Sequence, residues 1–282
     1  MQRSNINMQI SRKLILSGFT ALTIVYYLFL SPAQALPNGL LAAHKATYKL
    51  TMHQTTMSSD VAGVKGRLEV SFEASCDGWK IEQFLGFKLY SQESELLEHI
   101  AHISSFESLD GSEFIFTTRA FEDRKLSEEL SGIARRRPAD RKQVLVRYSL
   151  PEKESELLPA DTLFPGQHVE HILAAAKAGQ RLLRNTVFDG STQENPFEIS
   201  TFLGKPRIDT KSPFKELRER TLWPVRLAYY KIGAVAPEAD FEMAIELYDH
   251  GVAGDMLYDY GNFSVDVKLQ QIEILPMPSC PD

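Results

Sequence analysis

Apolar and polar side chains alternate with a period of two along most of this chain, the pattern of β-strands that bury one face. The first alternating run covers residues 45–52 and the second covers residues 67–74. A stretch rich in Ser, Asp and Gly separates them at 58–66. Together these segments predict a long antiparallel hairpin near the start of the fold.

The same alternation continues along the rest of the chain. Further runs lie at 80–90, 95–106, 113–121, 144–150 and 241–247, with turn-forming residues between several of them. In the last run, Phe263 to Leu269 place their apolar side chains on one face, whereas Ile272 and Ile274 fall on the other. A β-bulge near Gln270-Gln271 would restore the register and bend the sheet. The sequence therefore predicts an all-β, mainly antiparallel fold with a curved or rolled sheet.

One segment departs from the strand pattern and predicts a single prominent helix. It runs from Pro165 to Ala178, with a proline at its entry, an alanine run and Gly179 at its exit. Ile172, Leu173 and Ala176 share one stripe, so we expect this helix to cover an apolar opening of the sheet. Because there is no internal repeat or low-complexity linker, we expect residues 36–282 to form one domain.

Residues 1–35 have the composition of an export signal. A basic start containing Arg3, Arg12 and Lys13 precedes the apolar run 14–30, and small residues up to Ala35 form a cleavage site. The alternative is that this long apolar run is kept as a membrane anchor. No cysteine stands at the first position after the cleavage site, where a bacterial lipid would be attached, so we expect a periplasmic protein and not a lipoprotein.

The charge of the mature chain narrows the class of partner. The full chain has 31 Lys and Arg against 37 Asp and Glu, and removal of residues 1–35 changes the net charge to (31 − 3) − 37 = −9. This acidic balance argues against nucleic acid and anionic lipid headgroups as partners. The one dense basic cluster, Arg135 to Arg137 with Arg141 and Lys142, is interpreted as a solvated loop or turn.

The chain contains two cysteines, Cys76 and Cys280. In an oxidising compartment an even pair usually forms a disulfide, which would tie an early part of the fold to its last residues. The alternative is two free buried thiols.

Motifs of common enzyme classes are missing from the sequence. There is no G-x-S-x-G, phosphate-binding glycine loop, H-E-x-x-H or C-x-x-C. His168 and His171 could share a metal on one helix face, but no third ligand is indicated, and His99 and His102 would face opposite sides of a strand. We therefore expect no catalytic residue, no metal and no cofactor, with a hydrolase that uses turn carboxylates such as Asp189 as the weakest alternative.

Aromatic residues are spread over the predicted strands. They can simply pack in the core, or they can line a concave face that holds an apolar ligand. The candidate lining residues are Tyr48, Phe72, Phe114, Phe116 and Tyr229.

Several short motifs in sequence order resemble the EipB family of periplasmic cell-envelope integrity proteins. The resemblance spans most of the mature chain and rests on the motifs His44-Lys45-Ala46-Thr47-Tyr48, Cys76-Asp77-Gly78-Trp79, Leu163-Phe164-Pro165 with His168, Phe188-Asp189-Gly190-Ser191, Trp223-Pro224-Val225, Glu246-Leu247-Tyr248 with Gly251-Val252, Tyr258-x-Tyr260-Gly261-x-Phe263 and Cys280. At Gly261-Asn262 the family would more often have an aspartate in the second position.

This resemblance implies a β-spiral, a mostly antiparallel sheet wound into an open, barrel-like cup with one prominent helix and a disulfide between Cys76 and Cys280. It also implies an alphaproteobacterial periplasmic protein that supports envelope integrity without enzymatic activity. We expect it to act by binding an envelope protein through a rigid, disulfide-linked β scaffold. The alternative is a carrier that holds a lipid, lipopeptide or lipoprotein acyl chain in the concave face of the cup.

Overall fold

The computed structural model describes residues 41–136, 143–152, 155–193, 195–233 and 238–280. The chain divides into two compact units, Met1–Asn38 and Gly39–Asp282, and all the described residues belong to the second. The predicted signal segment, residues 1–35, lies outside the described residues. Within the described part of the chain, no helix is long and apolar enough to cross a membrane.

The described residues of the second unit form β-strands and one helix, as the alternation predicts. The strands before the helix are β1 (His44–Thr55), β2 (Gly63–Ala74), β3 (Gly78–Tyr90), β4 (Glu95–Ser108), β5 (Glu113–Glu122), β6 (Lys125–Arg136), β7 (Gln143–Leu150) and β8 (Glu156–Pro159). The helix α1 (Pro165–Lys177) follows. The strands after it are β9 (Leu182–Val187), β10 (Phe197–Leu203), β11 (Arg207–Ile208), β12 (Thr221–Lys231), β13 (Phe241–Tyr248), β14 (Ala253–Asp259) and β15 (Phe263–Ile274).

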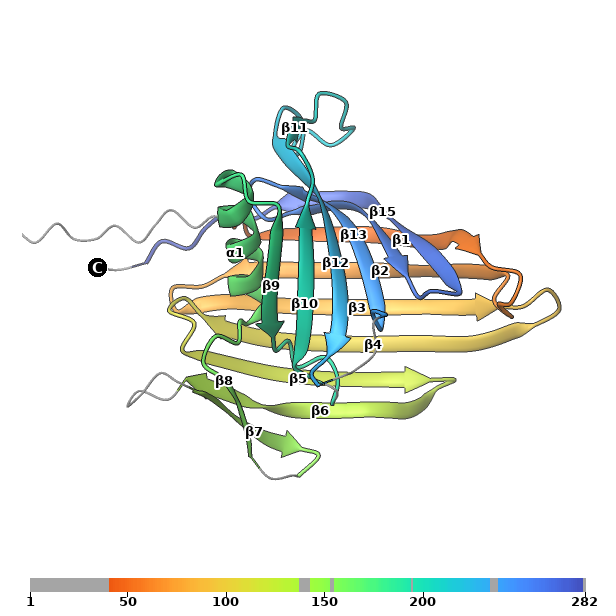
Figure 1. The fold of residues 1–282 in the computed structure, drawn as a ribbon, viewed down its shortest axis with the longest axis horizontal. Helices are drawn as coiled ribbons and strands as arrows, with labels where there is room; N and C mark the ends of the chain where they lie inside the picture. The colour runs from red at the N-terminus through yellow and green to blue at the C-terminus, as the bar shows by residue number, and fades with distance from the viewer. Residues whose placement is uncertain (1–40, 137–142, 153–154, 194, 234–237, 281–282) are drawn as a thin grey trace, which may run out of the picture. The chain divides into compact units, whose positions relative to one another are not determined.

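All of these strands belong to a single antiparallel sheet. Its order is β8-β7-β6-β5-β4-β3-β2-β1-β15-β14-β13-β12-β10-β9, with β11 paired to β12 alone. The long strands β1–β6 form one limb, and β9, β10, β12 and β13 form a second limb that crosses it (Figure 1). Residues after β8 join the far edge, because the Leu163 N–H donates to the Thr186 carbonyl at 2.8 Å. The sheet is therefore nearly closed and barrel-like, as predicted.

The pairing register confirms two local predictions. Strands β1 and β2 form the expected hairpin, with Tyr48 opposite Leu68. Between β1 and β15, Thr47 pairs with Gln271 and Tyr48 with Leu269, which leaves Gln270 as the extra residue of a β-bulge.

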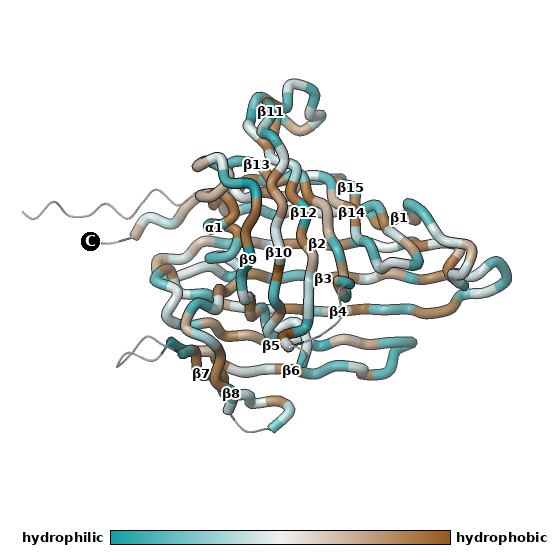
Figure 2. The backbone as a smooth tube through the Cα atoms, viewed as in Figure 1, coloured by the Kyte–Doolittle hydropathy of each residue, from teal (hydrophilic) through white to brown (hydrophobic). Residues whose placement is uncertain are grey.

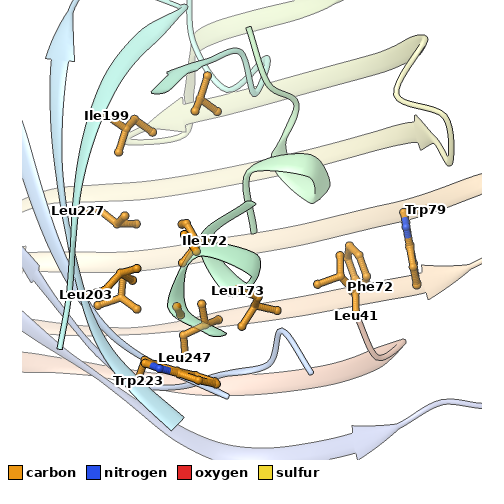
Figure 3. Close-up of a cluster of buried hydrophobic side chains, with 14 of the residues drawn as sticks. Leu41, Phe72, Trp79, Ile172, Leu173, Ile199, Leu203, Trp223, Leu227 and Leu247 are labelled. Atoms are coloured by element: carbon orange, nitrogen blue, oxygen red, sulfur yellow. The ribbon is translucent and has the colours of Figure 1, made fainter. Parts of the chain in front are cut away.

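Helix α1 lies between the two limbs and closes one end of the sheet. Ile172 and Leu173 are buried, as predicted from their shared stripe. Figure 3 shows them between Leu203, Leu227 and Leu247 of the second limb and residues of the first limb. Hydrophobic segments occur along β9, β10 and β12 (Figure 2), and buried residues of these strands pack in one cluster with those of α1.

The basic cluster at the end of β6 differs from the prediction. Arg135 and Arg136 belong to the strand and not to a solvated loop, whereas Arg137, Arg141 and Lys142 lie outside the described residues. Arg136 donates to the carbonyls of Ala160 and Thr162, at 2.8 and 2.7 Å. It therefore holds the segment that leads into α1, a long-range role that a charge run in the sequence does not reveal.

Cys76 and Cys280 form a disulfide, with 5.5 Å between their Cα atoms. Cys76 lies in the turn between β2 and β3, and Cys280 lies in the exposed segment that follows β15. The bond therefore links the C-terminal segment to the turn that joins β2 to β3.

Candidate ligand-binding cavity

A cavity of about 350 Å³ lies inside the sheet, between the two limbs and the start of α1. A volume of this size is within the range of small-molecule sites, which runs from about 300 to 1,000 Å³. The walls come from β1–β3 on one side, β12–β14 on the other, and the first residues of α1. The cavity therefore forms where segments far apart in the sequence face each other.

Most of the cavity wall is apolar. Tyr48, Phe72 and Tyr229, three of the five predicted lining residues, are part of it. Leu68, Val70, Ile81, Val169, Met243, Met256 and Tyr258 also contribute. Methionine side chains adapt their shape to an apolar ligand, and aromatic rings offer it a large apolar contact area.

The structure places Phe114 and Phe116, the other two predicted lining residues, in a different part of the core. They are 0 and 1 % exposed and pack with Phe164 and Phe188 in a separate aromatic cluster. The Phe114 ring centroid is 5.1 Å from that of Phe164. These two rings therefore serve packing beside α1 and do not line the cavity.

The polar part of the cavity wall contains His44, Gln83, Asp189 and His250. The His44 Nδ1 lies 2.7 Å from the Ala42 carbonyl and donates to it. Burial lowers the pKa of His44, although its backbone hydrogen bond opposes this shift. Burial also lowers the pKa of His250 to about 4, so both imidazoles are neutral at pH 7.

Tyrosine hydroxyl groups add further polar atoms to an otherwise apolar wall. Tyr48 donates to the Ala253 carbonyl at 2.7 Å and so joins β1 to β14 across the cavity. Burial raises the pKa of Tyr48, Tyr229 and Tyr258, so all three remain protonated at neutral pH.

A buried carboxylate fixes the helix end that closes the cavity. Glu107 of β4 is 2 % exposed and accepts hydrogen bonds from the N–H groups of Gly166 and Gln167, at 2.7 and 2.9 Å. These are unpaired donors of the first helical turn, and a negative charge at this position is favoured by the helix dipole. Burial outweighs both hydrogen bonds and raises the pKa of Glu107 to about 7.

Glu107 is a functional residue that no sequence motif marks. One signal was available, because Ile103, Ser105 and Glu107 occupy the inward positions of a strand. A carboxylate on a face that is otherwise buried usually has a specific partner. The partner itself lies 59 residues further along the chain, beyond the reach of local patterns.

The histidines considered as metal ligands do not come together with further ligands. His99 stacks on Phe87 and His102 contacts Phe84, the two pairs on opposite faces of the strands. The Nδ1 atom of His171 lies 3.1 Å from the Asn185 amide, whereas His168 is buried, with its pKa lowered to about 4. Among the described residues, no group of three or more His, Cys, Asp or Glu side chains is placed to hold a metal ion.

The fold and the cavity define a class: a barrel-like protein made from one curved antiparallel sheet, closed at one end by a helix, with a largely apolar cavity inside. Residues 35–276 match the EipB-like family, and the chain belongs to this family. This match confirms the resemblance found in the sequence motifs.

Two relatives place this assignment in context. The chain is 30% identical over 253 residues to the cell envelope integrity protein EipB of Brucella abortus (strain 2308), a match that covers 87% of this chain and 89% of the relative. It is also similar to the crystal structure of a beta-barrel-like protein of the domain of unknown function DUF1849 from Brucella abortus, with a TM-score of 0.75 and 28% identity. That match covers 84% of this chain and 99% of the other.

Proposed function

We propose that this protein supports the integrity of the cell envelope, in the periplasm, after removal of residues 1–35. The observation that carries this proposal is the 30% identity, over 87% of the chain, to a protein named for envelope integrity. We further propose that it acts by non-covalent binding and not by catalysis. The ionisable groups Glu107 and Arg136 support this view, because the hydrogen bonds of both hold the start of α1.

The first candidate role is docking of an envelope protein on the outer face of β9 and β10. Leu182 and Phe202 are opposite each other on these strands and are 74 and 45 % exposed. The Arg181 guanidinium lies 5.2 Å from the centre of the Phe202 ring. Aromatic, apolar and arginine side chains together are typical of protein-binding surfaces.

A site-specific crosslink tests this role. A photoreactive amino acid at position 202 is expected to capture one defined envelope protein in cells, and Leu182→Lys should abolish that product. The control places the same probe at Ile115, which is 38 % exposed on β5. A product with the same partner and yield at both positions, or no product at position 202, would contradict the docking role.

The second candidate role is that of a carrier for an acyl chain, and the cavity of about 350 Å³ supports it. Native mass spectrometry of protein isolated from the periplasm is expected to show a bound amphiphile. Val70→Trp, which adds bulk at the cavity wall, should remove the bound mass while thermal unfolding shows that the variant remains folded. A single ligand-free mass in several preparations would argue against a carrier.

A further inference from the structure

A groove of about 440 Å³ lies on the outer face of β1–β5, the face opposite to the cavity (Figure 1). Its floor is one row of side chains that crosses the strands. In this row Ser71 of β2 pairs with Glu82 of β3, Glu82 with Ser104 of β4, and Ser104 with Thr117 of β5. Because neighbouring strands are about 4.8 Å apart, the row is about 14 Å long. The groove therefore suits a narrow ligand that lies across the strands.

The groove is open because the aromatic rings on its two sides lean away from the floor. Phe84 is two residues from the floor row on one side, and a Cβ at Gly86 would lie 3.0 Å from the tip of its ring. Phe106 is two residues from the row on the other side, and a Cβ at Gly78 would lie 2.7 Å from its ring. Each ring thus fills the space left by a glycine beyond it and leaves the floor uncovered.

The floor and the wall beside it carry polar groups that are free to bind a ligand. The Ser104 and Thr117 hydroxyls, the Glu82 carboxylate and the His102 ring have no hydrogen-bond or ion-pair partner among the described residues. Each hydroxyl can donate one hydrogen bond and accept two, and a carboxylate can only accept. A ligand in the groove therefore meets both donors and acceptors.

The charges of the groove favour an uncharged ligand. Its walls and floor contain two cationic side chains, Lys45 and Arg119, and two anionic ones, Glu69 and Glu82, so the formal charges cancel. Lys45, Arg119 and Glu69 are already in ion pairs with residues outside the groove, at 3.0–3.4 Å. An anion would meet the free Glu82 carboxylate, and a cation would meet Lys45 and Arg119.

A peptide fits this groove less well than a sugar does. Strands β1–β5 are interior strands that are paired on both sides, so they offer no free edge to an added peptide strand. The floor also lacks the apolar centre of a typical protein-binding surface.

A sugar ring, in contrast, has C–H groups on its faces and hydroxyl groups around its rim. The Phe84 ring lines the groove and can pack against such a face. The Arg67 guanidinium, 4.8 Å from the ring centre, helps to hold Phe84 in place.

We propose that this groove binds an uncharged, linear oligosaccharide, with one sugar ring against Phe84 and its hydroxyl groups paired with Glu82, Ser104 and Thr117. The groove is separate from the interior cavity and from the surface of β9 and β10. A saccharide site can therefore be tested independently of the carrier and docking roles.

Calorimetric titration of the oxidised, mature protein with four β-1,4-linked or related tetramers tests the proposal. The neutral probes are cellotetraose and tetra-N-acetylchitotetraose, and the charged probes are the glucosamine tetramer and tetragalacturonate. At least one neutral tetramer is expected to bind about ten-fold more tightly than either charged tetramer. No binding of either neutral tetramer, binding of a charged tetramer that is as tight, or tighter binding of an uncharged Gly/Ser octapeptide overturns the proposal.

Variants on the outer face locate the site. Ser104→Tyr fills the floor at an exposed strand position, where tyrosine is well tolerated, and should weaken binding of the neutral tetramer at least ten-fold. Thr117→Val removes one hydroxyl with little change of shape and should weaken it about five-fold. Ser149→Tyr, at an exposed position of β7 outside the groove, is the matched control and should bind as the parent does. Parent-like affinity in both groove variants, or an equal loss in Ser149→Tyr, contradicts the proposal.

Discussion

Loss of the disulfide should strongly destabilise the protein without changing its native structure. The double variant Cys76→Ser/Cys280→Ser removes a link between residues that are 204 positions apart. In the chain-entropy model, a closed loop of that length stabilises the fold by about 5 kcal/mol, because it restricts the unfolded chain. The free energy of unfolding should therefore fall by up to about 5 kcal/mol.

The structure explains why the native state should tolerate this change. Residues 276–280 are exposed and lie outside every strand, so opening the bond removes no contact from the core. The sheet order, including the pairing of β1 with β15, does not depend on these residues. Circular dichroism of the variant should therefore match that of the parent protein.

Denaturant unfolding and thermal melting measure the effect. For a chain of this size, a loss of about 5 kcal/mol lowers the Tm by about 10–20 °C. Addition of a reductant to the parent protein should reproduce the shift, and the same reductant should have no effect on the double variant. A decrease of less than about 1 kcal/mol, in a variant shown to be folded, would refute the argument from unfolded-chain entropy.

Three further predictions concern buried groups. The pKa of Glu107 rises from 4.5 to about 7 on folding, so the protonated form is favoured in the native state. This group should therefore cost about 3 kcal/mol of stability as pH rises from 4.5 through 7. In denaturant titrations, Glu107→Gln should remove that part of the pH dependence. The pKa of His168 falls from 6.5 to about 4 on folding, so this group should cost about 3 kcal/mol of stability as pH falls from 6.5 through 4. His168→Leu should therefore shift acid unfolding to lower pH. The control His53→Gln, at an exposed position, should not. Gly190 has a φ of 64°, and a Cβ there would lie 2.6 Å from the Phe116 ring. Gly190→Ala should therefore destabilise the protein by about 1–3 kcal/mol. A Tm equal to that of the parent would contradict this, because it would show that the aromatic cluster around Phe116 can shift to accept the methyl group.

Local patterns in the sequence were sufficient for much of the fold. Period-two alternation identified β1 to β5, β7 and β13, since strand residues point alternately to opposite faces. The bulge at Gln270 was visible as a change of phase between Leu269 and Ile272. The helix could be placed because proline, alanine and glycine act through local backbone preferences.

Strand β6 shows why local patterns fail elsewhere. Its inward positions include Glu128, Gly132 and Ala134, which do not form an apolar stripe. Position 132 requires glycine because a Cβ there would lie 2.4 Å from the Arg147 carbonyl oxygen and 2.9 Å from the Phe116 ring. The residue at this position is thus chosen by a neighbouring strand and not by its own β propensity.

The sequence by itself determined that the chain forms strands, that one face of each is apolar, and where the helix begins. The tertiary structure alone decided what lies opposite each apolar face. Phe116 and Tyr229 have the same kind of strand position, yet Phe116 meets Phe188 in a filled cluster and Tyr229 meets a cavity. Alternation fixes the direction of a side chain, whereas cavities and buried partners such as Glu107 and Gly166 depend on contacts between distant segments.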